Sequence, residues 1–143
     1  MPRNISKINS LVKVRKMLED QRRVELAQLR EKEYMAVEKL SSLRTEKKRS
    51  QSQLGENKGN TALYLSYLDN LSERLSSQSI LIKELRVEIE EARQLLLQSS
   101  KSRKVVEKLL DREIKNYMQN MIIQERKHLD EIASIRFMKS NIL

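Results

Sequence analysis

The chain has 143 residues, of which 34% are charged and 3% aromatic, and its net charge at pH 7 is +9. A globular core of this length usually contains more aromatic side chains and more turn residues, so the composition favours long helices over a compact fold. The absence of cysteine excludes disulfides and thiolate metal sites, and no apolar run approaches the ~20 residues of a membrane span.

The first helix is predicted over residues about 5–54, where apolar residues recur at alternating intervals of three and four. This spacing places them on one seam, as in a coiled coil. The apolar seam residues are Ile5, Ile8, Val12, Leu26, Leu29, Ala36, Leu40, Leu43 and Leu54. The same frame also contains Arg15, Glu19 and Arg22, whereas a neighbouring frame contains Leu11, Val14 and Leu18. We therefore expect a local shift of the seam, a stutter, between Val12 and Leu26.

The first helix is also the basic part of the sequence. Residues 1–54 hold 14 Lys and Arg against 7 Asp and Glu, and four of these cations crowd near the end, at Arg44, Lys47, Lys48 and Arg49. Such a patch suits an acidic protein surface, nucleic acid or anionic lipid. A solvated face of a coiled coil is the alternative reading of the same charges.

A break in the helical pattern is predicted at about residues 55–60. The only two glycines, Gly55 and Gly59, stand there, and the only proline is Pro2. Glycine relieves the steric cost of the backbone reversal that ends a helix. The fold expected is therefore an all-α, antiparallel two-helix coiled-coil hairpin, forming a single domain over residues 1–143.

The second helix is predicted over residues about 61–138, with Asn60 and Thr61 as candidate N-cap residues. Its seam contains Tyr64, Leu68, Leu71, Leu75, Ile82, Leu85, Ile89, Ala92, Leu96, Val106 and Leu110. The soft patch 99–102 interrupts this seam without a glycine or a proline. Beyond Leu110 we expect the apolar stripe to continue with another shift of phase.

The two predicted helices have unequal lengths, so the second helix cannot pair with the first along its whole length. In an antiparallel coiled coil the numbers of paired residues add to a constant, and a sum of 118 pairs Leu43 with Leu75. A sum of 111, which pairs Leu40 with Leu71, is the open alternative. In either register some 25 residues, ~40 Å of helix, project past the hairpin. Because this overhang carries many apolar residues, we expect a partner to cover it.

The sequence offers no catalytic, cofactor or metal site. Glu125 and His128 have the Glu-x-x-His spacing of di-iron bundles, but those sites need two such motifs, and His128 is the only histidine. The glycines lack the Lys-Ser/Thr of a phosphate-binding loop. We therefore expect a protein that is not an enzyme. Nucleic-acid binding is also unexpected, because exposed aromatic residues for base stacking are scarce.

The chain resembles the FliJ family, cytoplasmic stalk proteins of the flagellar type III export apparatus that are related to the YscO-type stalks of injectisomes. Three stretches carry the resemblance over nearly the full length. The first is the basic N-terminal helix, and the second is the break at 55–60 with the Tyr-containing helix start that follows. The third and most specific is the C-terminal stretch ERKHLDEIASIRF at 125–137.

The resemblance implies two contact surfaces. The terminal regions of FliJ-like proteins insert into the ring of the hexameric export ATPase, which assigns that contact to Met118, Met121, Ile122, Leu129, Ile132, Ile135, Arg136 and Phe137. The family's surface for the cytoplasmic domain of the export-gate membrane protein maps to Lys39, Leu43, Tyr67, Leu71, Arg74 and Gln78. Glu46 and Ser50 stand where the family has aromatic residues.

The resemblance further implies contacts with export chaperones and a cytoplasmic location, peripheral at the inner-membrane export apparatus. Residues 1–10 contain no apolar segment typical of a secretory signal, which agrees with that location. Two alternatives remain open. One is a basic coiled-coil protein associated with nucleic acid, and the other is a homo-oligomeric scaffold in which the overhang packs against a second copy.

Overall fold

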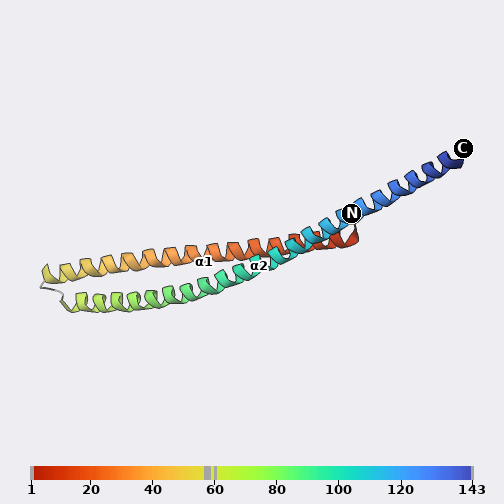
Figure 1. Ribbon diagram of the computed structural model, residues 1–143. Coiled ribbons are helices and arrows are strands. Elements are labelled where there is room, and N and C mark those ends of the chain that lie inside the picture. The colour runs from red at the N-terminus through yellow and green to blue at the C-terminus, as the bar shows by residue number, and fades with distance from the viewer. Residues whose placement is uncertain (1, 57–58, 60, 143) are drawn as a thin grey trace. The chain divides into compact units, whose positions relative to one another are not determined.

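The computed structural model describes residues 2–56, 59 and 61–142, and within these ranges it contains two helices and no strand. Helix α1 comprises Arg3–Glu56 and helix α2 comprises Thr61–Ile142 (Figure 1). The two helices pack against each other, which confirms the predicted all-α hairpin. Asn60, a candidate N-cap of the second helix, lies outside the described residues.

The chain divides into two compact units. The hairpin unit comprises residues 19–99, and the terminal unit comprises residues 1–18 and 100–143. Each unit contains a segment of α1 and a segment of α2.

One face of α1 is buried along its whole length. Every position of the predicted frame, at alternating intervals of three and four from Ile5 to Leu54, is buried or half-buried, and Leu18 and Glu25 beside it are half-buried as well. Glu19 is 3% exposed and lies on this face, whereas Val14 is 60% exposed and lies off it. The stutter expected between Val12 and Leu26 is therefore absent. The Arg23 guanidinium donates to the Glu19 carboxylate at 3.0 Å, so the helix tolerates a buried charge without a change of frame.

The core of the hairpin unit centres on Ala36, Ile82 and Leu85, with Leu29 and Leu40 packed against them. Nearer the start of α2, the side chain of Leu71 is fully buried. Each of these residues lies on the seam predicted for its helix. Apolar periodicity therefore located the core of this unit correctly.

Hydrogen bonds between side chains and across the seam join α1 and α2 in the hairpin unit. Gln78 Nε2 donates to the Ala36 carbonyl at 2.9 Å, Arg86 Nε to Glu33 Oε1 at 3.5 Å, and the Tyr67 hydroxyl to Glu46. The residue numbers of the Arg86–Glu33 pair add to 119, which is close to the 118 register. Those of the Gln78–Ala36 and Tyr67–Glu46 pairs add to 114 and 113, which lie between the 118 and 111 registers. These bonds therefore do not select one register for the whole hairpin unit.

The glycines act differently from the expectation. Helix α1 continues through Gly55 to Glu56, and neither Gly55 nor Gly59 has a positive φ. A Cβ atom added at Gly55 would meet no atom within 4 Å. The connection between the helices therefore begins after Glu56, and Gly55 costs helix propensity without providing a left-handed residue.

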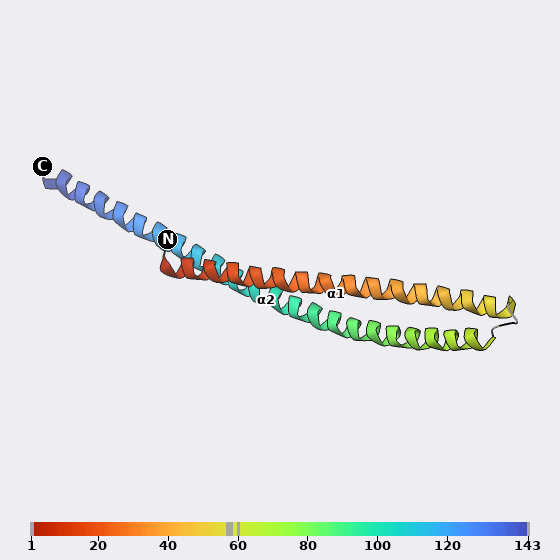
Figure 2. The ribbon, with the colours of Figure 1, turned by 180° about the vertical axis from the view of Figure 1, so that it is seen from behind.

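In the terminal unit, the seam ends before α2 does. Ile5 and Val106 are buried, whereas from Lys115 to Asn141 every side chain is exposed except the half-buried Ile132. Both views show α2 continuing well beyond the start of α1 (Figure 1; Figure 2). Residues 115–141 thus form a lone helix in this structure, which we call the terminal helix.

Replacing Leu71 by Ala tests the seam directly. Because the side chain is fully buried, Leu71→Ala should lower the free energy of unfolding by about 3 kcal/mol. Leu63→Ala is the matched control, since Leu63 is exposed on the same helix. Urea unfolding followed by circular dichroism measures both variants, and equal losses of stability would contradict the burial of Leu71.

Replacing Gly55 by Ala should raise the stability of the protein. The position is helical and open, so alanine adds about 0.5 kcal/mol of helix propensity without a clash. The midpoint of thermal unfolding is the measurement. A lower midpoint would mean that Gly55 adopts a conformation that alanine cannot.

Candidate functional site

Two adjoining hollows open on the surface of the hairpin unit. The larger, of about 600 Å³, is lined by Gln28, Glu31, Lys32, Met35, Ala36, Lys39, Gln78, Leu81 and Leu85. The smaller, of about 400 Å³, is lined by Lys39, Leu43, Asn70, Glu73, Arg74, Ser77 and Gln78. Lys39 and Gln78 line both, so we treat the hollows as one hairpin groove.

Small and polar seam residues create the space of the groove. At Ala36 a methyl group stands where most seam positions carry a larger side chain. The buried Gln78 side chain is held back by its hydrogen bond to the Ala36 carbonyl. Met35 and Leu81, which are 61% and 44% exposed, add apolar surface beside it. The groove therefore has apolar walls and, at Lys39 and Arg74, cationic side chains.

Four of the six residues predicted to contact the export gate line the smaller hollow, namely Lys39, Leu43, Arg74 and Gln78. Tyr67 is exposed and donates its hydroxyl to Glu46. The Leu71 side chain is fully buried in the seam, so its role in this structure is to support the neighbouring surface. The structure thus brings most of the set together on one side of the hairpin unit.

Sequence reasoning missed the apolar part of the groove. Met35 and Leu81 are apolar residues that lie off the seam, and both remain exposed. An apolar residue outside the heptad frame is the signal that could have identified them. The hollow itself has no sequence signal, because it depends on the pairing of Ala36 with Gln78 across two helices.

The residues predicted to contact the ATPase lie on the terminal helix, where all but the half-buried Ile132 are exposed. At about 100° per residue, six of them fall within roughly 60° of one line along the helix. These six are Met118, Met121, Ile122, Leu129, Ile132 and Arg136. Ile135 and Phe137 flank this line by about 100° on either side. We call the five apolar members of the line the terminal stripe.

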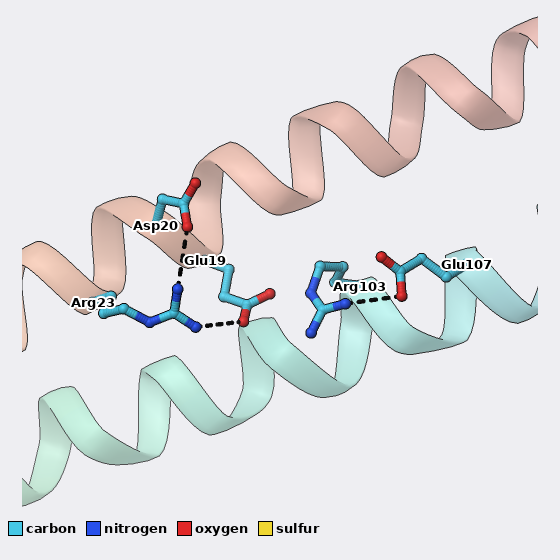
Figure 3. A network of polar contacts seen from close by, with 5 residues as sticks. All are labelled: Glu19, Asp20, Arg23, Arg103 and Glu107. Atoms are coloured by element: carbon cyan, nitrogen blue, oxygen red, sulfur yellow. Dashed lines mark hydrogen bonds and ion pairs between the residues drawn. The ribbon is translucent and has the colours of Figure 1, made fainter.

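Ion pairs within single helices stiffen both units. In the hairpin unit Arg23 donates to Glu19 at 3.0 Å and to Asp20 at 3.3 Å (Figure 3). In the terminal unit Arg103 donates to Glu107 at 2.8 Å. Pairs at these spacings each stabilise a helix by about 0.2–0.5 kcal/mol.

The side chains with shifted pKa values also belong to pairs within a single helix, on its surface. Hydrogen bonds from Arg93 and Gln94 lower the pKa of Glu90 to about 2. A hydrogen bond with Glu38 raises the pKa of Tyr34. All these side chains are exposed on helix surfaces. They do not converge in a pocket, as an acid–base site would require.

In the described part of the chain, no group of three or more His, Cys, Asp or Glu residues is arranged to hold a metal ion. Nor does either described helix contain a stretch apolar enough to cross a membrane.

A known protein family matches this chain. The family described as "Flagellar FliJ protein" matches residues 4–141, which is nearly the whole chain. No curated protein and no solved structure matches the chain.

Proposed function

The chain belongs to the FliJ family of flagellar proteins, and from this we propose that it is a non-enzymatic stalk of the flagellar type III export apparatus. Its terminal helix inserts into the ring of the hexameric export ATPase. The hairpin unit binds the cytoplasmic domain of the export gate. The observation that carries the proposal is the exposed terminal stripe, which has no partner among the described residues.

The terminal helix has the surface of a segment that is buried on assembly. Burying one Met, Leu or Ile side chain contributes about 1.5–3 kcal/mol, so the five residues of the terminal stripe offer a large gain to a partner. A ring lumen lined by apolar loops would cover this helix on all sides. That geometry also accounts for Ile135 and Phe137, which lie outside the terminal stripe yet remain exposed.

The hairpin groove suits the second contact. Its apolar walls at Met35 and Leu81 provide area to bury, and Lys39 and Arg74 provide charges that fix the orientation of a partner. Such a groove accepts a short apolar segment with acidic flanks. We assign it to the gate, and through the gate the chain would be peripheral at the inner membrane. The export chaperones are further partners implied by the family.

A homo-oligomeric scaffold is the second candidate function. The terminal stripe favours it specifically, because five apolar residues near one line could pack against a second copy. The two functions differ in what occupies the terminal stripe, so one set of variants tests both.

Charges placed in the terminal stripe should abolish the ATPase contact. Met121→Asp combined with Leu129→Asp puts two carboxylates where burial is proposed, and stimulation of the cognate export ATPase should fall at least tenfold. Asn116→Asp with Gln119→Asp is the control, because both residues are exposed outside the terminal stripe. The rate of ATP hydrolysis against chain concentration is the measurement.

Full stimulation by the Met121/Leu129 variant would show that the terminal stripe does not enter the ring. Sedimentation velocity on the same proteins measures their oligomeric state and so distinguishes the scaffold function from the stalk function. If the unaltered chain is a dimer and the Met121/Leu129 variant a monomer, the terminal stripe is a self-association surface.

Charge reversal in the hairpin groove should weaken binding to the gate. Lys39→Glu with Arg74→Glu changes the cations of the smaller hollow, and affinity for the soluble gate domain should fall about tenfold or more. Lys48→Glu with Lys83→Glu alters the net charge equally at exposed residues outside the hairpin groove. Titration calorimetry measures both variants, and equal losses would exclude the hairpin groove as the gate surface.

A further inference from the structure

The whole net charge of the chain lies in the terminal unit. The hairpin unit, residues 19–99, holds 14 Lys and Arg against 14 Asp and Glu, so it is neutral. The terminal unit holds 15 against 6, which gives the full +9. The cations at Arg44–Arg49, which make the first helix look basic near its end, are balanced by acidic residues within the hairpin unit.

Both helices contribute to the charge of the terminal unit. Residues 3–18 of α1 contain five basic residues and no acidic one. On α2 basic residues recur at intervals of three and four at Lys101, Lys104, Lys108, Arg112 and Lys115, and all five are exposed. At about 100° per residue they lie within roughly 60° of one line, opposite the buried Val106. We call these five residues the basic stripe.

Residues 101–115 hold six Lys and Arg against three Asp and Glu, so their own acidic residues offset the basic stripe only in part. In the described residues of this unit, Glu107 pairs with Arg103, which lies on the half-buried side, and no ion pair involves a member of the basic stripe. Lys104, Lys108 and Arg112 are instead neighbours at i, i+4. Like charges at this spacing destabilise a helix by about 0.2–0.5 kcal/mol each. An anionic partner would remove this repulsion.

We propose that the basic stripe docks on an acidic collar of protein side chains at the mouth of the ring and steers the terminal helix into it. This inference rests on the proposed function. Lys115 precedes Met118 by about one helical turn, so the basic stripe ends where the terminal stripe begins along α2, on a face about 90° away. A helix inserted up to Met118 therefore brings the basic stripe to the rim of the ring.

The terminal stripe favours a protein over the other anionic surfaces. Glu125 lies about 20° from its line, between Ile122 and Leu129. A lipid surface would have to bury that carboxylate in hydrocarbon, whereas a protein can supply a donor. A nucleic acid would neutralise the basic stripe but leave the terminal stripe exposed. An apolar lumen with an acidic rim covers both stripes.

Such a collar acts mainly on the rate of association. Complementary charge at an interface rim raises the association rate constant and leaves the dissociation rate largely unchanged. Salt screens the effect, because the Debye length falls from about 10 Å at 0.1 M to about 3 Å at 1 M ionic strength.

The test measures association of the full chain with the assembled ATPase ring by stopped-flow fluorescence. Lys104→Glu with Lys108→Glu reverses the centre of the basic stripe, and the association rate constant should fall about tenfold at about 0.05 M salt. The difference from the unaltered chain should vanish at about 0.5 M salt. Lys48→Glu with Lys83→Glu, with the same change of net charge in the hairpin unit, should stay within about twofold.

Circular dichroism is used to check that each variant is helical. Lys104→Gln with Lys108→Gln is a second, milder variant, and its association rate constant should fall by a smaller factor. Equal association rates for the Lys104/Lys108 variants and the Lys48/Lys83 control would overturn the collar while leaving the stalk function intact. Failure of the unaltered chain to bind the ring would overturn both. The collar would also be overturned if the Lys104/Lys108 variants lost binding to phosphatidylglycerol vesicles or duplex DNA but bound the ring as fast as the unaltered chain.

Discussion

The packing of α1 against α2 along one heptad seam is the constraint on which the rest of the structure depends. Most of the stability of a helix in a protein comes from packing of its apolar face, and each seam residue needs an opposite partner to bury its surface. In the terminal unit Ile5 of α1 and Val106 of α2 are buried, and Leu110 and Ile114 are half-buried. Beyond Ile114 the described residues of this unit supply no partner, and the apolar surface of α2 is exposed. A binding surface thus arises from a difference in helix length.

Polar residues in the seam exchange stability for a defined geometry. The buried Glu19 carboxylate accepts a hydrogen bond from Arg23, and the buried Gln78 amide donates one to the Ala36 carbonyl. A leucine at either position would bury more apolar area. The polar contacts are instead satisfied in one alignment, as single polar residues are in other coiled coils. At Ala36 this choice also leaves the space that becomes the hairpin groove.

Apolar periodicity predicted the parts of the fold that depend on it. It gave the hairpin, the core at Ala36, Ile82 and Leu85, and the helix that outlasts its partner. Apolar periodicity wrongly predicted the stutter. It counts only apolar residues as seam positions, and it therefore could not identify Glu19, a charged residue that is buried in the seam and accepts a hydrogen bond from Arg23. The helix end predicted at Gly55 was also wrong. A glycine permits a left-handed backbone conformation but does not require one, and Gly55 is helical. The hairpin groove lay beyond prediction, because it forms between residues of two helices.

The terminal helix lacks a partner among the described residues of the free chain and, as we propose, gains one in the ring, and hydrogen–deuterium exchange distinguishes these two states. A lone helix opens easily, so amides of residues 115–141 should exchange fast in the free protein and those of the hairpin core slowly. Adding the ATPase ring should protect residues 115–141 strongly and leave the core near Leu71 unchanged. Exchange in residues 115–141 that is already slow in the free chain, or that the ring does not alter, would contradict the account.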